Sequence, residues 1–179
     1  PVPPKLYGGT ERVVSYITEE LVRQGHQVTL FASGDSETSA ELVACAEQSL
    51  RLDPQVRDPH AHNVLMMEKV RQRASEFDVL HFHTDYMFFP LIRDHRLPSV
   101  TTLHGRLDLP DLITLYREFK DIPLVSISDH QRLPLPPVNW AGTVYHGLPA
   151  DLYPFRENPS ADYLAFLGRN LKECLGIFL

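Results

Sequence analysis

Helical and extended patterns alternate along almost the whole chain, and this alternation constrains the fold more than any other feature. We predict helices over residues 10–24, 63–77, 86–96 and 111–120, and short apolar strands over residues 26–33, 78–83, 99–103, 123–127 and 142–146. Residues 41–52 fit either a strand or a helix. Short apolar strands that alternate with helices are typical of a parallel sheet. The sequence therefore predicts an α/β fold in which helices cover both faces of a parallel sheet.

The first two predicted helices each carry an apolar face. The residues expected on these faces are Val13, Val14, Ile17, Leu21 and Val22 in the first helix, and Val64, Met67, Val70 and Ala74 in the second. We expect Thr10 to cap the first helix and Gly25 to end it. Pro90 is expected to break or kink the third helix.

The two ends of the sequence bear on its domain organisation. We predict one domain over residues 1–150, a linker over 151–161 and the start of a second domain over 162–179. A doubly wound sheet usually begins with a strand, and no strand pattern precedes the loop at residues 1–9. We therefore expect a truncated chain without its first strand, and association through the exposed edge of its sheet.

Composition excludes several classes of protein. With 17 Lys and Arg against 23 Asp and Glu, the chain has a formal net charge of −6 and no basic stripe, so we expect no nucleic-acid partner. No apolar run approaches the roughly 20 residues of a membrane-spanning helix. The two cysteines, Cys45 and Cys174, fit no metal-ligand spacing and favour a reduced, cytoplasmic setting.

Polar residues and glycines follow several predicted strands, where ligands of open α/β sheets bind. His104 comes directly after an apolar strand, so its imidazole could bond a ligand hydroxyl or exchange a proton. A histidine bonded to backbone at the strand end is the alternative. The other candidates at these ends are Asp85, Gly105, Arg106 and Ser128. Ser128 could equally cap a helix.

Two further groups of residues could bind ligands. Gly8, Gly9 and Glu11 lie where a loop enters the first helix, so backbone N–H groups there could face a phosphate. The alternative is a plain turn. His81 and His83 share a strand face near Asp85 and could bind zinc, but no further ligand pattern accompanies them, and we expect no metal. Trp140 is expected in the core.

Taken in order, several stretches resemble the N-terminal half of a retaining GT-B glycosyltransferase of the group 1 or family 4 kind. These are YGGTERVVSYITEELVRQGHQVTLFASGDS, DVLHFHTDY, VTTLHGRL, PLVSISDHQR, VYHGLPADLYPF and YLAFLGR. The resemblance implies a Rossmann-like, acceptor-side domain that faces a donor-binding domain. It implies that Gly8 and Gly9 approach the donor phosphate and sugar, that His104 contacts the donor sugar near the reacting centre, and that Arg169 helps to bind the diphosphate.

The resemblance also sets expectations for activity. It implies transfer of a sugar from a nucleotide-sugar substrate to a sugar or small-molecule acceptor, with fixed donors rather than a metal cofactor stabilising the leaving diphosphate. After Arg169 the chain reads NLKECLGIFL, which departs from the family pattern and leaves Lys172 out of register. We therefore expect little activity from this chain alone. The alternatives are a non-catalytic sugar- or partner-binding module and a zinc hydrolase that uses His81, His83 and His104.

Overall fold

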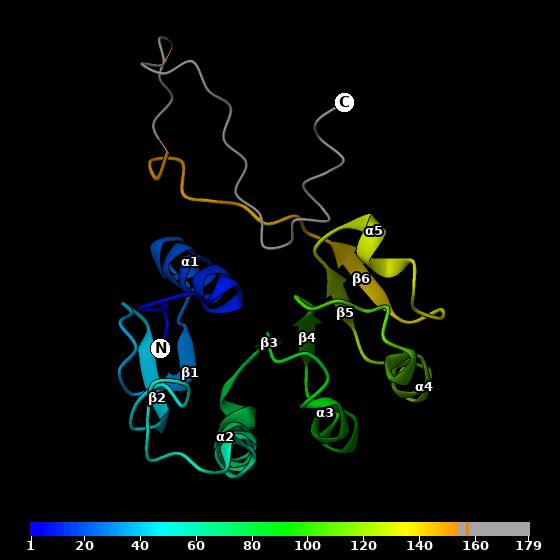
Figure 1. The fold of residues 1–179 in the computed structure, drawn as a ribbon, viewed down its shortest axis with the longest axis horizontal. Helices are drawn as coiled ribbons and strands as arrows, with labels where there is room; N and C mark the ends of the chain where they lie inside the picture. The colour runs from blue at the N-terminus through cyan, green and yellow to red at the C-terminus, as the bar shows by residue number, and fades with distance from the viewer. Residues whose placement is uncertain (154–156, 158–179) are drawn as a thin grey trace. The chain divides into compact units, whose positions relative to one another are not determined.

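The computed structural model describes residues 1–153 and 157 (Figure 1). The chain divides into two compact units, Pro1–Leu148 and Pro149–Leu179, and every described helix and strand lies in the first. In the second unit, the Leu152 N–H donates to the Pro149 carbonyl across a turn. The domain boundaries stay predictions, and the expected second domain at 162–179 lies outside the described residues.

Helices and strands alternate in the predicted order. The structure confirms the α/β, Rossmann-like class and resolves residues 41–52 as a strand followed by loop. The elements are α1 (Gly9–Arg23), β1 (Thr29–Ser33), β2 (Glu41–Ala46), α2 (Pro59–Arg73), the 3-10 helix η1 (Ala74–Glu76), β3 (Leu80–Phe82), α3 (Phe89–His95), β4 (Ser99–Thr102), α4 (Pro110–Glu118), β5 (Leu124–Ser126), α5 (Asp129–Arg132) and β6 (Trp140–Thr143).

The strands form two parallel sheets rather than one. β1 pairs with β2, while β3, β4, β5 and β6 are hydrogen-bonded in that order. A common doubly wound sheet has the strand order 3-2-1-4-5-6. The pair β1-β2 matches positions 2 and 3 of that order, β3, β4 and β5 match positions 4, 5 and 6, and β6 adds one strand beyond them; the described residues contain no strand at position 1. Helices α2, α3 and α4 lie on one side of the strands, and α1 and α5 on the other (Figure 1).

The helix starts differ from two of the predictions. Gly8 occupies the N-cap position of α1 and makes no side-chain cap bond, so the expected Thr10 cap is wrong. Pro90 lies in the first turn of α3 and begins the helix instead of kinking it, because a proline there has no intrahelical N–H partner to lose. Gly25 follows α1 with a φ of 90°, as expected for a glycine stop.

The core packs between the four-stranded sheet and helices α2, α3 and α4. The best-buried large side chains are Tyr116, Phe88, Phe89, Leu103 and Leu124. Trp140 packs against this core, as predicted. Burying each large apolar side chain contributes about 1.5–3 kcal/mol, so this cluster supplies much of the stability of the first unit.

The predicted helix faces are only partly confirmed. Val70 and Ala74 are buried, whereas Val64 is 57% exposed. In α1 the buried residues are Ser15 and Thr18, and the predicted apolar residues lie half-buried around them. Small side chains let a helix approach its neighbours closely, which an apolar pattern alone does not reveal.

The last two features of the described residues concern membrane-spanning helices and free cysteines. None of their helices is long and apolar enough to span a membrane. Cys45 is a half-buried free thiol on β2, and burial raises its pKa. A raised pKa leaves less of the reactive thiolate, as expected for a structural cysteine.

Candidate functional site

Three histidines from separate strand ends lie in a row. His83 follows β3, His104 lies just beyond β4, and His146 lies beyond β6. His83 Nδ1 and His104 Nε2 are 2.8 Å apart, and His104 Nδ1 and His146 Nε2 are 3.3 Å apart. The ring centroids are separated by 5.1 Å and 5.4 Å. We call these three residues the histidine row.

Two rings of the row, those of His83 and His104, stay neutral near pH 7. Burial lowers the pKa of His83 to about 3 and that of His104 to about 4. Neighbouring imidazoles add to both shifts, because a charge on one ring opposes a charge on the next. Near neutral pH each of these two rings therefore carries one N–H and one bare nitrogen. His104 can donate one hydrogen bond and accept one.

Asp85 lies against the backbone of His104 and Gly105. It follows β3 in a left-handed conformation with a φ of 50°, which aspartate tolerates better than most residues. Burial raises the pKa of its carboxyl group, while the backbone N–H groups of His104 and Gly105 act against this rise. Its Oδ1 is buried without a hydrogen-bond partner of ordinary geometry in the described part of the chain. A Cβ on Gly105 would lie 3.7 Å from Asp85 Oδ2, an ordinary contact distance.

The side chain of Gln131 holds the loop that carries His104 by hydrogen bonds to its backbone. Its Nε2 donates to the carbonyls of Leu103 and Gly105 at 3.0 and 2.9 Å, and its Oε1 accepts from the N–H of Ile127 at 2.9 Å. Ser128 caps α5 by accepting from the Gln131 N–H at 3.1 Å. The structure thus gives Ser128 its predicted capping role and makes it a support for the His104 loop.

A second group of candidates lies at the start of α1. A Cβ on Gly8 would come within 2.7 Å of the Pro4 Cβ and 2.8 Å of Glu11 Oε2, so only glycine fits there. A Cβ on Gly9 would meet nothing within 4 Å. Glu11 pairs with Arg51, which comes from the segment after β2. Packing therefore explains Gly8, while Gly9 borders open space.

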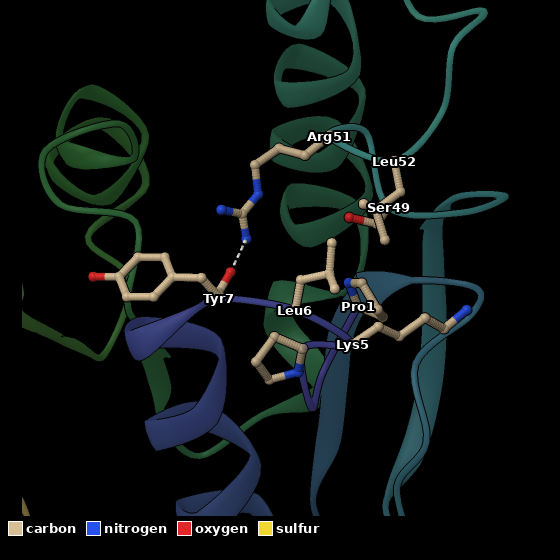
Figure 2. Close-up of a pocket in the computed structure, with 8 residues that line it drawn as sticks. Pro1, Lys5, Leu6, Tyr7, Ser49, Arg51 and Leu52 are labelled. Atoms are coloured by element: carbon tan, nitrogen blue, oxygen red, sulfur yellow. Dashed lines mark hydrogen bonds between the residues drawn. The ribbon is translucent and has the colours of Figure 1, made fainter.

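A hollow of about 240 Å³ lies beside this loop (Figure 2). Figure 2 shows the Arg51 guanidinium reaching over to the Tyr7 carbonyl, to which it donates at 3.3 Å. The hollow is lined by Pro1, Pro4, Lys5, Leu6, Tyr7, Ser49, Arg51 and Leu52. It shares no residue with the histidine row, whose imidazoles His83 and His104 have pKa values lowered by burial.

The remaining candidates are arginines. Arg106 is exposed and donates to both carboxylate oxygens of Asp108, at 2.6 and 2.7 Å. Arg106 therefore lies close to the His104 loop, but its guanidinium is paired with Asp108. Arg169 lies outside the described residues.

The histidines at the strand ends bond to one another, and His81 on β3 bonds to a hydroxyl. His81 Nε2 lies 2.8 Å from Thr102 Oγ1, and no three described His, Cys, Asp or Glu side chains converge on a point that could hold a metal ion. The geometry of these residues gives no support to the zinc alternative.

Sequence reasoning gave no site role to Gln131 or Arg51, and it noted His146 only as the end of a predicted strand, without a specific role. His146 ends the predicted strand 142–146 and directly precedes Gly147, and this position could have marked it as a site residue. Strand β6 ends at Thr143, three residues before His146, so the irregular segment between them brings the ring to His104. No short motif marks Gln131, because two of its three backbone partners, the carbonyls of Leu103 and Gly105, lie 28 and 26 residues away.

Comparison with known proteins agrees with the resemblance of the sequence. A search of curated proteins finds no match. The family model described as Glycosyltransferase Family 4 matches residues 7–171, which is nearly the whole chain. The match covers α1, both sheets and the strand ends that carry the histidine row. The chain therefore belongs to glycosyltransferase family 4.

Proposed function

We propose that this chain is the acceptor-side domain of a retaining transferase that moves a sugar from a nucleotide-sugar donor to a sugar or small-molecule acceptor. The observation that carries the proposal is the placement of His104, a neutral imidazole at the end of β4 on a loop that Gln131 holds by two hydrogen bonds and that Asp85 lies against. Such a ring can donate a hydrogen bond to a sugar hydroxyl or accept one from it without the cost of removing a charge from water.

The surrounding residues have supporting roles in this proposal. Nδ1 of His104 is the nitrogen that a ligand can reach, because its partner is the exposed ring of His146 at 3.3 Å. The backbone of Gly9 borders open space at the N-terminus of α1, where N–H groups favour a phosphate. Arg106 and Arg169 would add positive charge near the leaving diphosphate. We place the reaction in the cytoplasm, with no metal cofactor.

Substitution of His104 tests the proposal. In a protein that contains this domain and a donor-binding domain, His104→Ala is expected to lower sugar transfer by roughly two or more orders of magnitude, the usual range for loss of a positioned acid–base or charge-stabilising group. His60→Ala, on the exposed start of α2, is the matched control. Circular dichroism checks that both variants are folded. Transfer by His104→Ala at the rate of the control would refute the assigned role.

A non-catalytic sugar-binding module is the second candidate. The observation that favours it is that both ring nitrogens of His104 already have partners within the protein. The two functions differ in turnover: a binding module would hold a sugar without transferring it, even beside a donor-binding domain. The chain alone is expected to show little transfer under either proposal, so the comparison requires both domains.

A further inference from the structure

The two hydrogen bonds of His104 differ in a way that divides the histidine row into an inner and an outer part. The inner bond to His83 is 2.8 Å long and joins two half-buried rings. The outer bond to His146 is 3.3 Å long and leads to an exposed ring. A long bond to an exposed partner is the easier one for a ligand to replace.

The inner bond couples the hydrogen positions of two rings. His83 Nδ1 and His104 Nε2 share one hydrogen, because two bare nitrogens make no hydrogen bond and two N–H groups repel. If His83 Nδ1 donates, His104 Nε2 is bare and the hydrogen of the neutral His104 ring lies on Nδ1. If His104 Nε2 donates, Nδ1 of His104 is bare and accepts.

We propose that His83 is a positioning residue that sets the tautomer of His104, so that His83 decides whether Nδ1 of His104 donates or accepts a hydrogen bond when a ligand hydroxyl takes the place of His146. This inference rests on the proposed function for the identity of that ligand as a sugar. The coupling between the rings is a property of the chain itself and is tested without any ligand.

The groups around the row are compatible with a neutral, coupled pair. His81 of β3 lies with its ring centroid 4.1 Å from that of His83, and packing around its partly exposed ring lowers its pKa. Asp85 lies by the backbone of His104, Tyr116 of α4 lies near Asp85 and Tyr86, and burial raises the pKa of Asp85 and Tyr116. From α5 the contact is made by the uncharged amide of Gln131.

Nitrogen chemical shifts of the imidazole rings test the inference. Long-range ¹H–¹⁵N spectra of the full chain near pH 7 report which nitrogen of each histidine carries hydrogen. The expected result is that His83 and His104 are both neutral and carry their hydrogens on nitrogens of the same name, both Nδ1 or both Nε2. Hydrogens on nitrogens of different names would overturn the proposal, and this wild-type measurement needs no variant.

Two substitutions then separate the inner partner from the outer one. His83→Phe keeps an aromatic ring but removes the shared hydrogen, so His104 is expected to change to a mixture of tautomers or to the opposite one. His146→Phe should leave the tautomer of His104 unchanged and raise its pKa, because a repelling imidazole is lost. His60→Phe is the control and should alter neither. A tautomer that follows His146 rather than His83 would contradict the assignment.

The outcomes for the two proposals remain distinct. Matched tautomers, together with no sugar transfer by a protein that contains both this domain and a donor-binding domain, would refute the transferase and leave the positioning of His104 by His83 intact. Unmatched tautomers in an active transferase would refute only the positioning role.

Discussion

Replacement of the two adjacent glycines at the start of α1 gives opposite expected effects on stability. In Gly8→Ala the new Cβ would lie 2.7 Å from the Pro4 Cβ and 2.8 Å from Glu11 Oε2, against about 3.5–4.0 Å for a comfortable carbon contact. The Pro4 ring belongs to the backbone and cannot rotate away. Forced contacts of this kind cost about 1–3 kcal/mol.

Gly9→Ala is the matched comparison. A Cβ at Gly9 meets nothing within 4 Å, and Gly9 is the first residue of α1. Replacing a helical glycine reduces the freedom of the unfolded chain, so this variant is expected to be unchanged or more stable by about 0.5 kcal/mol. The two substitutions add the same methyl group one residue apart, which isolates packing as the cause of any difference.

Urea denaturation followed by circular dichroism measures both effects. With a denaturant slope of about 2 kcal/mol per molar urea, Gly8→Ala should lower the midpoint by about 0.5–1.5 M, while Gly9→Ala should leave it in place or raise it slightly. Equal midpoints for the two variants would refute the packing argument. If Gly9 borders the donor phosphate as proposed, Gly9→Ala should weaken donor binding in a protein that stays folded.

Three other perturbations test the His104 loop, the core and the histidine row. Gln131→Ala should lower stability by about 1–3 kcal/mol in urea denaturation, because it leaves half-buried backbone groups at Leu103 and Ile127 without partners. Tyr116→Phe should be neutral or stabilising, since the buried Tyr116 hydroxyl has no hydrogen-bond partner in the described part of the chain, and a clear loss of stability would contradict this. The pKa values of His83 and His104 are lowered in the folded state, so the unfolded chain binds more protons below pH 6.5. Stability should therefore fall as the pH drops from about 6.5 towards 4, by up to about 1.4 kcal/mol per pH unit for each ring, and His83→Phe should flatten this slope.

The order of helices and strands could be predicted from the sequence because each element is short and amphipathic or apolar. The position of His104 just beyond β4 was also predictable, since a histidine directly after an apolar strand lies at the edge of a parallel sheet. These inferences depend only on local pattern and on one general rule about where α/β sheets bind ligands. The same rule made Asp85 and Gly105 candidates, and the structure places both beside His104, while their role in a site stays a prediction.

The features that the sequence did not reveal depend on contacts between distant residues. The His146 ring reaches His104 over a sequence separation of 42 residues, and Gln131 bonds to Leu103 over 28. The burial of Ser15 and Thr18 was missed because their hydroxyl groups read as polar in a helical pattern. The requirement for glycine at position 8 comes from Pro4 and Glu11 rather than from the conformation of its own backbone.

The parallel pairing of the described strands has a consequence for how quickly the protein folds. Parallel strands cannot be joined by a tight hairpin, and the closest paired residues here, Thr29 and Glu41, are 41 − 29 = 12 residues apart. Each ladder therefore forms only after a long stretch of chain has been brought back on itself, and this loss of chain freedom precedes any gain from pairing. Folding should be slower than in a helical bundle of similar length. During synthesis β1 and β2 emerge together, so their sheet can form before β6 leaves the ribosome and the four-stranded sheet is complete.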